Sequence, residues 1–300
     1  MKASLSFSTA ATPPPRRVRA MRSFDGQLSG AGGRRIYWQS WLPVRTSFAV
    51  VIAHGACEHS GRYQRLAEYL LEQGAAVYAL DHRGHGRSEG SRAYLDRFEH
   101  ACQDIDQVVE MARQAHRGRP LFLLGHSLGG ALALRYALKR QGKLAGLVLS
   151  SPAVALDGVP SGLMMIARLL SVVAPRTPLY PIAAQGISRD PAEVTAYQND
   201  ALIYRGKIPA RTVVELASFL EWLPAALPAL RLPLLVLHGT ADTLAPDTGG
   251  KRVHAAAGSL DKSLQLYEGG YHELFNELPG MREQVCQDLS RWLKRQQGKY

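Results

Sequence analysis

The sequence contains one short motif that could carry nucleophilic catalysis. Residues 125–129 read Gly-His-Ser-Leu-Gly and place Ser127 between two glycines. This G-x-S-x-G spacing is typical of a sharp turn from a strand into a helix that exposes the serine hydroxyl. The neighbouring sequence fits, because an apolar run at 121–124 precedes the motif and small and apolar residues at 130–137 follow it. We therefore predict that Ser127 is a nucleophile rather than a structural turn residue.

A serine hydroxyl needs a general base to take its proton and a third group to orient that base. With this motif the carboxylate and the histidine are expected later in the chain, in that order. Asp242 follows an apolar run at 234–237, and His272 follows another at 264–267. Both would stand at the carboxyl ends of strands, where parallel sheets gather functional residues. We predict a triad of Ser127, Asp242 and His272.

Two other residues compete for these roles. Asp247 lies in the same loop as Asp242, but it follows Pro246 and is expected at the start of a helix. His238 stands at a strand end beside Gly239, where a hydrogen-bonded structural role is expected.

Attack on an ester carbonyl creates an oxyanion, which backbone N–H groups can stabilise. One donor is expected from Leu128, the residue after the nucleophile. The second is expected from the loop after the apolar run at 48–53, and we predict Ala56, whose amide follows His54 and Gly55. The alternative interpretation of His54 and Gly55 is a turn that only ends the strand.

Short apolar runs alternate with helical patterns, which favours a mostly parallel α/β sheet flanked by helices. Most runs are continuous rather than alternating, as expected for strands covered on both faces. The predicted strands are residues 35–41, 48–53, 76–80, 121–124, 147–149, 234–237 and 264–267. The predicted helices are residues 62–72, 101–114, 129–139, 249–256 and 281–295.

A long segment separates the predicted strand at 147–149 from the next one, and a loop of that size would be anomalous in a compact domain. Residues 152–230 are therefore predicted to form a helical lid on a core of residues 25–151 and 231–300. The lid contains an apolar segment at 163–173. This segment is either an ordinary buried helix or a wall of a lipophilic pocket.

The net charge of +11 raises nucleic acid or anionic lipid as a partner. Five positive charges precede the first acidic residue, Asp25, so part of the excess is local. Residues 1–24 lack the apolar stretch of a secretory signal, and we predict a disordered basic leader, with a transit peptide as the alternative. No nucleic-acid-binding module is recognisable, so no nucleic-acid partner is predicted.

The three cysteines, Cys57, Cys102 and Cys286, show no metal-binding spacing and predict neither a disulfide framework nor zinc. Residues 81–88 include two histidines without an acidic cluster, which indicates a turn that braces the active site. We expect no metal and no organic cofactor. No apolar run reaches the roughly 18–20 residues needed to cross a bilayer, and we expect a cytoplasmic protein, with peripheral membrane contact as an option.

Five segments together resemble the monoacylglycerol lipase and lysophospholipase branch of the α/β-hydrolases. They are HGACEHSGRY (54–63), DHRGHGRSEG (81–90), FLLGHSLGG (122–130), HGTADTL (238–244) and YEGGYHELFNE (267–277). The resemblance covers nearly the whole chain from about Phe24 onward. It implies the α/β-hydrolase fold, and it implies the triad and the oxyanion donors predicted above.

The resemblance extends to residues 187–202 of the predicted lid, and it implies hydrolysis of a monoacylglycerol to glycerol and a fatty acid through an acyl-enzyme. It also implies that Glu58, Arg62 and Tyr197 contact the glycerol end. The family often has glycine where this chain has Cys57. Either the thiol narrows the alcohol side of the site and is sensitive to thiol reagents, or it is tolerated as a small residue.

Two other functions stay open at this point. One is a carboxylesterase or lysophospholipase that acts on another lipophilic monoester. The other, from a different class, is a non-catalytic binding protein with the same fold. If the protein is a lipid esterase of either kind, monoacylglycerol lipase or other monoesterase, its lid could contact lipid surfaces transiently. The sequence leaves the oligomeric state open.

Overall fold

The computed structural model describes residues 22–155 and 161–300. Its centre is an eight-stranded sheet with the order β1-β2-β4-β3-β5-β6-β9-β10, in which β1 and β2 are antiparallel to their neighbours and the remaining pairs are parallel. This is the mostly parallel sheet that the sequence predicts. The strands are β1 (Arg22–Ser29), β2 (Arg35–Leu42), β3 (Phe48–Ala53), β4 (Ala75–Leu80), β5 (Leu121–His126), β6 (Gly146–Ser150), β9 (Leu234–Gly239) and β10 (Lys262–Tyr267).

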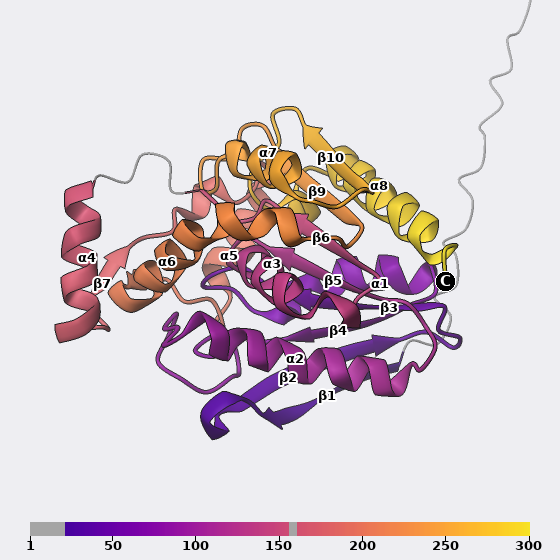
Figure 1. The fold of residues 1–300 in the computed structure, drawn as a ribbon, viewed down its shortest axis with the longest axis horizontal. Coiled ribbons are helices and arrows are strands. Elements are labelled where there is room, and N and C mark those ends of the chain that lie inside the picture. Colours follow the sequence, from indigo (N-terminus) through magenta and orange to yellow (C-terminus); the bar gives the residue numbers. More distant parts are fainter. Residues whose placement is uncertain (1–21, 156–160) are drawn as a thin grey trace, which may run out of the picture.

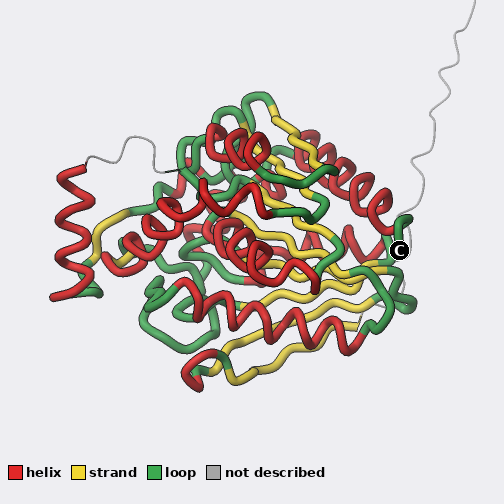
Figure 2. The backbone as a smooth tube through the Cα atoms, viewed as in Figure 1, coloured by secondary structure: helices red, strands yellow, loops and turns green. Residues whose placement is uncertain are grey.

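Helices cover both faces of the sheet (Figure 1; in Figure 2 the yellow strands run between red helices). All six residues of β3 are buried, and they alternate between two hydrophobic cores. Val51 packs in the core that includes α2 and α3, whereas Val50 and Ile52 pack in the core that includes α1 and α8. The helices around the sheet are α1 (Gln64–Glu72), α2 (Phe98–Ala115), α3 (Leu128–Arg140), α7 (Asp247–Ala256) and α8 (Pro279–Gln297).

The first strand, β1, is a difference from the sequence prediction. It begins at Arg22, so the prediction of a disordered leader up to residue 24 is wrong for Arg22–Phe24, while residues 1–21 lie outside the described residues. The strand pairs with β2 along its whole length at the edge of the sheet, and its side chains are mostly exposed. Backbone pairing therefore holds it in place, and no buried apolar pattern marks it in the sequence.

The segment between β6 and β9 is mainly helical and also contains two short strands. We call the described residues 161–230 of this segment the insertion. Figure 1 shows α4 at the far edge of the molecule, beyond α6. The elements of the insertion are α4 (Ser161–Val173), β7 (Pro178–Tyr180), α5 (Pro191–Asn199), β8 (Ile208–Pro209) and α6 (Ala210–Ala226), with β7 and β8 paired antiparallel. Among all the helices described, none is both long enough and apolar enough to cross a bilayer.

Candidate active site

Ser127 occupies a tight turn between β5 and α3. Its backbone is left-handed, with φ of 51°, a conformation that few non-glycine residues adopt. The flanking glycines are required by close packing, because a Cβ on Gly125 would lie 2.3 Å from the carbonyl oxygen of Gly129. A Cβ on Gly129 would lie 2.1 Å from the carbonyl oxygen of Ala53 on the neighbouring strand. The turn therefore presents the serine at the carboxyl end of a central strand.

Asp242 and His272 meet at the same edge of the sheet. Nδ1 of His272 lies 2.7 Å from Oδ2 of Asp242, whose other oxygen accepts the backbone N–H groups of Leu244 and Ala245. Burial opposes ionisation of Asp242, but the charge of His272 and these hydrogen bonds hold its pKa well below the usual range. Burial likewise opposes protonation of His272, yet the Asp242 carboxylate outweighs it and raises the histidine pKa. Asp242 can therefore orient the imidazole and stabilise the imidazolium that forms when His272 takes up a proton.

Ser127 and His272 line the same pocket. Within the described residues no hydrogen bond joins the two side chains. Without substrate such bonds are often long or poorly aligned, and they tighten when the substrate is bound. The ring of His126, which comes just before the serine, packs against the ring of His272 with centroids 4.7 Å apart.

The two competing residues have other partners. His238 is fully buried, and its Nε2 lies 2.8 Å from the carbonyl oxygen of Ala245, so it braces the loop that carries Asp242. Asp247 is the first residue of α7 and forms an ion pair with Lys251 at 2.7 Å. Neither His238 nor Asp247 lines the pocket.

The predicted oxyanion donors, Ala56 and Leu128, both line the pocket. Leu128 is the first residue of α3, where backbone N–H groups lack an intrahelical acceptor. The loop that carries Ala56 is fixed by its neighbour His54, whose Nδ1 contacts the carbonyl oxygen of Gly55 at 2.7 Å. Nε2 of His54 accepts the backbone N–H of His82 at 2.9 Å, so the turn at 81–88 braces this loop.

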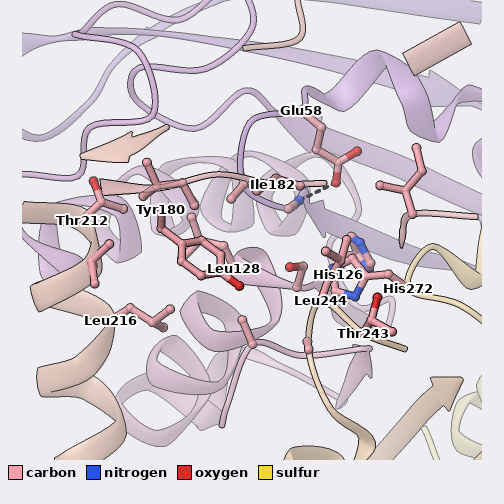
Figure 3. A pocket seen from close by; sticks show the side chains of 18 of the residues that line it. Glu58, His126, Leu128, Tyr180, Ile182, Thr212, Leu216, Thr243, Leu244 and His272 are labelled. Atoms are coloured by element: carbon pink, nitrogen blue, oxygen red, sulfur yellow. Dashed lines mark hydrogen bonds between the residues drawn. The ribbon is translucent and has the colours of Figure 1, made fainter. Parts of the chain in front are cut away.

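One end of the pocket is polar. Arg62 donates to both oxygens of Glu273, at 2.5 and 2.7 Å, and to Glu58 at 3.2 Å. Glu58 also accepts the hydroxyl of Tyr63 and, at 2.5 Å, the N–H of Gly55, the bond that Figure 3 shows as a dashed line. Burial raises the pKa of Glu58, whereas Arg62 outweighs burial and lowers the pKa of Glu273. The result is a buried network beside residues 54–59, which we call the oxyanion loop after its predicted role.

The structure separates the residues that the resemblance places at the glycerol end. Glu58 and Tyr197 line the pocket, but Arg62 does not; it lies over the Tyr197 ring, 4.9 Å from the centroid. Glu273 also lines the pocket and was missed by the sequence reasoning. The sequence does contain a signal for this residue: Glu273 directly follows the predicted general base, His272, in the segment YEGGYHELFNE.

The other end of the pocket is apolar, and most of its wall comes from the insertion. Figure 3 shows Glu58, His126 and His272 on one side, and Tyr180 and Leu216 on the other. The pocket has a volume of about 350 Å³. Apolar residues of the insertion that line it include Met164, Ala167, Leu179, Tyr180, Ile182, Val213 and Leu216.

Helix α4 contributes only some of its apolar side chains to this wall. Met164 and Ala167 line the pocket, but five other apolar side chains described in the helix are more than half exposed. The interpretation of residues 163–173 as an ordinary buried helix is therefore wrong. The exposed side chains are Met165, Ile166, Leu169, Val172 and Val173.

Cys57 lies in the oxyanion loop but outside the pocket wall. It adopts φ of 66°, and only 1% of it is exposed. Burial, with a smaller contribution from the charge of Glu58, raises the pKa of its thiol to about 12. Because the thiolate is the reactive form, these features favour the interpretation of a tolerated small residue over that of a reactive thiol.

The sheet order, the serine on a tight turn after a central strand, and the acid and histidine after later strands define an α/β-hydrolase. A family model described as "Serine aminopeptidase, S33" (Hydrolase_4) matches residues 45–279. The chain belongs to this family, and within it to the group of the monoacylglycerol lipases. Among the described residues, no group of three or more histidine, cysteine or acidic side chains is arranged to hold a metal ion.

Three similar proteins support the placement. The monoacylglycerol lipase of Mycolicibacterium smegmatis is 39% identical over 92% of this chain and 98% of its own. The human monoglyceride lipase is 38% identical over 89% of each chain. The crystal structure of the Paleococcus ferrophilus monoacylglycerol lipase superposes with a TM-score of 0.79 at 33% identity, covering 87% of this chain and 99% of that one. These findings confirm the predicted family and fold.

Proposed function

We propose that the protein hydrolyses monoacylglycerols to glycerol and a fatty acid, with Ser127, Asp242 and His272 as the catalytic triad. The observation that carries this proposal is the position of Ser127 in a pocket with a polar end and an apolar end. The polar end suits the hydroxyl groups of glycerol, and the apolar end suits an acyl chain. The named activity of the two lipases from Mycolicibacterium smegmatis and human agrees with this arrangement.

The mechanism is acyl transfer in two steps. His272 takes the proton of Ser127, the hydroxyl oxygen attacks the ester carbonyl, and the N–H groups of Ala56 and Leu128 hold the oxyanion. His272 then gives the proton to the glycerol oxygen as glycerol departs. The acyl group stays bound to Ser127 as an ester. A water molecule repeats the sequence, and the fatty acid is released as the serine recovers its proton.

The apolar end of the pocket supplies binding energy that the chemistry itself does not need. Each methylene of the acyl chain contributes about 0.8 kcal/mol when it leaves water. We therefore propose that residues 152–230 act as a lid, whose described wall residues, such as Met164 and Leu216, shelter the acyl chain. The rate should rise with chain length until the channel is full, and a maximum at acetyl would point to a carboxylesterase instead.

The test of the proposed function combines covalent labelling with turnover. A fluorophosphonate probe should label the wild type but not a Ser127→Ala variant, and the variant should lose about 10⁴-fold or more in kcat for 1-oleoylglycerol. An absence of labelling in the folded wild type would favour a non-catalytic binding protein. Cleavage of aminoacyl nitroanilides in place of 1-oleoylglycerol would favour an aminopeptidase.

We also propose that α4 contacts lipid surfaces. Its exposed apolar side chains, among them Leu169 and Val172, stand next to the wall of the pocket that holds the acyl chain. A Leu169→Ser/Val172→Ser variant should sediment less with phosphatidylcholine liposomes and keep its activity on a dispersed short-chain ester. Equal sedimentation of the two proteins would count against the contact.

The three cysteines, all free and buried, support a reducing, cytoplasmic location.

A further inference from the structure

The polar end of the pocket presents negative groups and hides the positive one. Glu58 and Glu273 are both among the residues that line the pocket, and their side chains are 4% and 6% exposed. Their shared partner, Arg62, lies behind them and is not part of the wall. Among the described residues that line the pocket, none is lysine or arginine. A molecule that enters this end therefore meets two acidic residues and no lysine or arginine.

The charges of this group do not cancel. Two carboxylates share one guanidinium, so above the raised pKa of Glu58 the group of Glu58, Arg62 and Glu273 carries a net charge of −1. The two lining histidines do not neutralise it, because burial and the neighbouring charge of His272 lower the pKa of His126 to about 3, and His272 is paired with a carboxylate of its own, that of Asp242. In a buried site such a charge is weakly screened.

The carboxylates still have acceptor capacity. An ionised carboxylate offers about four acceptor positions. Glu58 accepts from Gly55, Arg62 and Tyr63, and Glu273 accepts twice from Arg62 and once from Asn276. Each therefore has about one position left for a donor that enters the pocket. Hydroxyl groups and cationic head groups can use these positions, whereas a phosphate brings only further negative charge.

We propose that Glu273 is a specificity-determining residue that makes the alcohol end of the pocket reject anionic head groups. Esters whose alcohol is neutral or cationic are accepted, and monoesters that carry a phosphate, such as lysophosphatidic acids, are excluded. This inference rests on the proposed function and deepens it. Glu273 is the deciding residue because, without its charge, Glu58 and Arg62 form a neutral pair.

The experiment measures binding, so that it does not depend on turnover. Dissociation constants are measured for Ser127→Ala and for Ser127→Ala/Glu273→Gln with three decanoyl esters: 1-decanoylglycerol, decanoylcholine and decanoyl lysophosphatidic acid. In the single variant the phosphate ester should bind about tenfold or more weakly than the other two, from repulsion between close buried charges. The Glu273→Gln change should remove most of that difference. Decanoylcholine controls for head-group size, because it is bulky but positive.

Glu193→Gln in the Ser127→Ala background is the matched control. Glu193 pairs with Arg65 and lies outside the pocket, so its loss should leave the ratio of dissociation constants unchanged. Thermal unfolding reports whether each variant is folded, and if Glu273→Gln is not, Glu273→Ala in the same background takes its place. A difference that persists in the folded Glu273 variant overturns the proposal. Equal binding of the phosphate ester and 1-decanoylglycerol, or no binding of any ester, overturns the proposal. Failure of the wild type to turn over 1-oleoylglycerol while the binding selectivity holds overturns only the proposed function.

Discussion

The two parts of the insertion that enclose the pocket are attached to the core in different ways. Around α5, at the polar end, ion pairs and a backbone hydrogen bond from Tyr204 to Cys57 tie the chain to the core. Helix α4, at the apolar end, packs on α6, and the exposed side chains of Arg168 and Glu221 form an ion pair between the two helices. The ion pairs near α5 include Arg65–Glu193 at 2.7 Å and Arg189–Glu277 at 3.0 Å, and His59 and Asp200 are hydrogen-bonded at 2.8 Å.

This difference matches what each end has to do. A glycerol group is recognised by directional hydrogen bonds, which need acceptors held in place before the substrate arrives. An acyl chain is bound by the hydrophobic effect, which is not directional and tolerates a wall that adapts. Segments with few buried contacts and exposed apolar side chains open at low free energy, so α4 is the part of the insertion expected to move.

The largest effect should come from breaking the charge network at the polar end. Arg62→Ala leaves Glu58 and Glu273 buried without their cation and should lower the free energy of unfolding by about 3–5 kcal/mol. The matched change at the apolar end, Arg168→Ala, removes a surface ion pair and should cost about 0–1 kcal/mol. Urea unfolding of the two variants measures both values. Similar losses would mean that the two ends are held alike.

A smaller effect is expected at the link between α5 and the oxyanion loop. Asp200→Asn weakens the contact with His59, three residues after Ala56, and should cost about 1 kcal/mol. Because the loop carries a predicted oxyanion donor, kcat should fall more than KM rises. Glu221→Gln, at the α4 pair, serves as the control and should change neither constant. An unchanged kcat for Asp200→Asn would separate this link from catalysis.

Of the two ends of the pocket, only the polar one should affect the pH dependence. Burial lowers the pKa of His272, but Asp242, Glu273 and Glu58 together raise it above its usual 6.5. The base works only when neutral, so kcat/KM should fall as the pH drops through a value above 6.5. Glu273→Gln removes one negative charge and should move this acidic limb to lower pH. Glu221→Gln should not move it, and a limb that stays fixed in both variants would refute the electrostatic role of Glu273.

The smallest effect is expected at Cys57, which lies where the polar end of the insertion meets the oxyanion loop. Its buried, protonated thiol should react slowly, so treatment of the native enzyme with iodoacetamide at neutral pH should leave turnover of 1-oleoylglycerol almost unchanged. Mass spectrometry of the treated protein locates any modification. Rapid inactivation with Cys57 alkylated would show that this loop opens far more readily than its contacts suggest.

Much of the sheet could be predicted because its strands are buried on both faces. The runs at 48–53 and 121–124 are apolar throughout, and the structure places β3 at Phe48–Ala53 and begins β5 at Leu121. The edge strand β1 could not be predicted in this way, because backbone pairing with β2 rather than burial holds it. Helix α4 was ambiguous for a related reason, since its apolar residues face both the pocket and solvent.

The order of Ser127, Asp242 and His272 after successive apolar runs was determined by the sequence, because parallel strands bring their carboxyl ends to one edge. The need for glycine at positions 125 and 129 could likewise be predicted, because a tight turn leaves no room for a Cβ there. The partners of Arg62 were decided only in three dimensions. Glu273 lies 211 residues away, and no local pattern says which of two carboxylates a buried guanidinium will join or which groups will face the pocket.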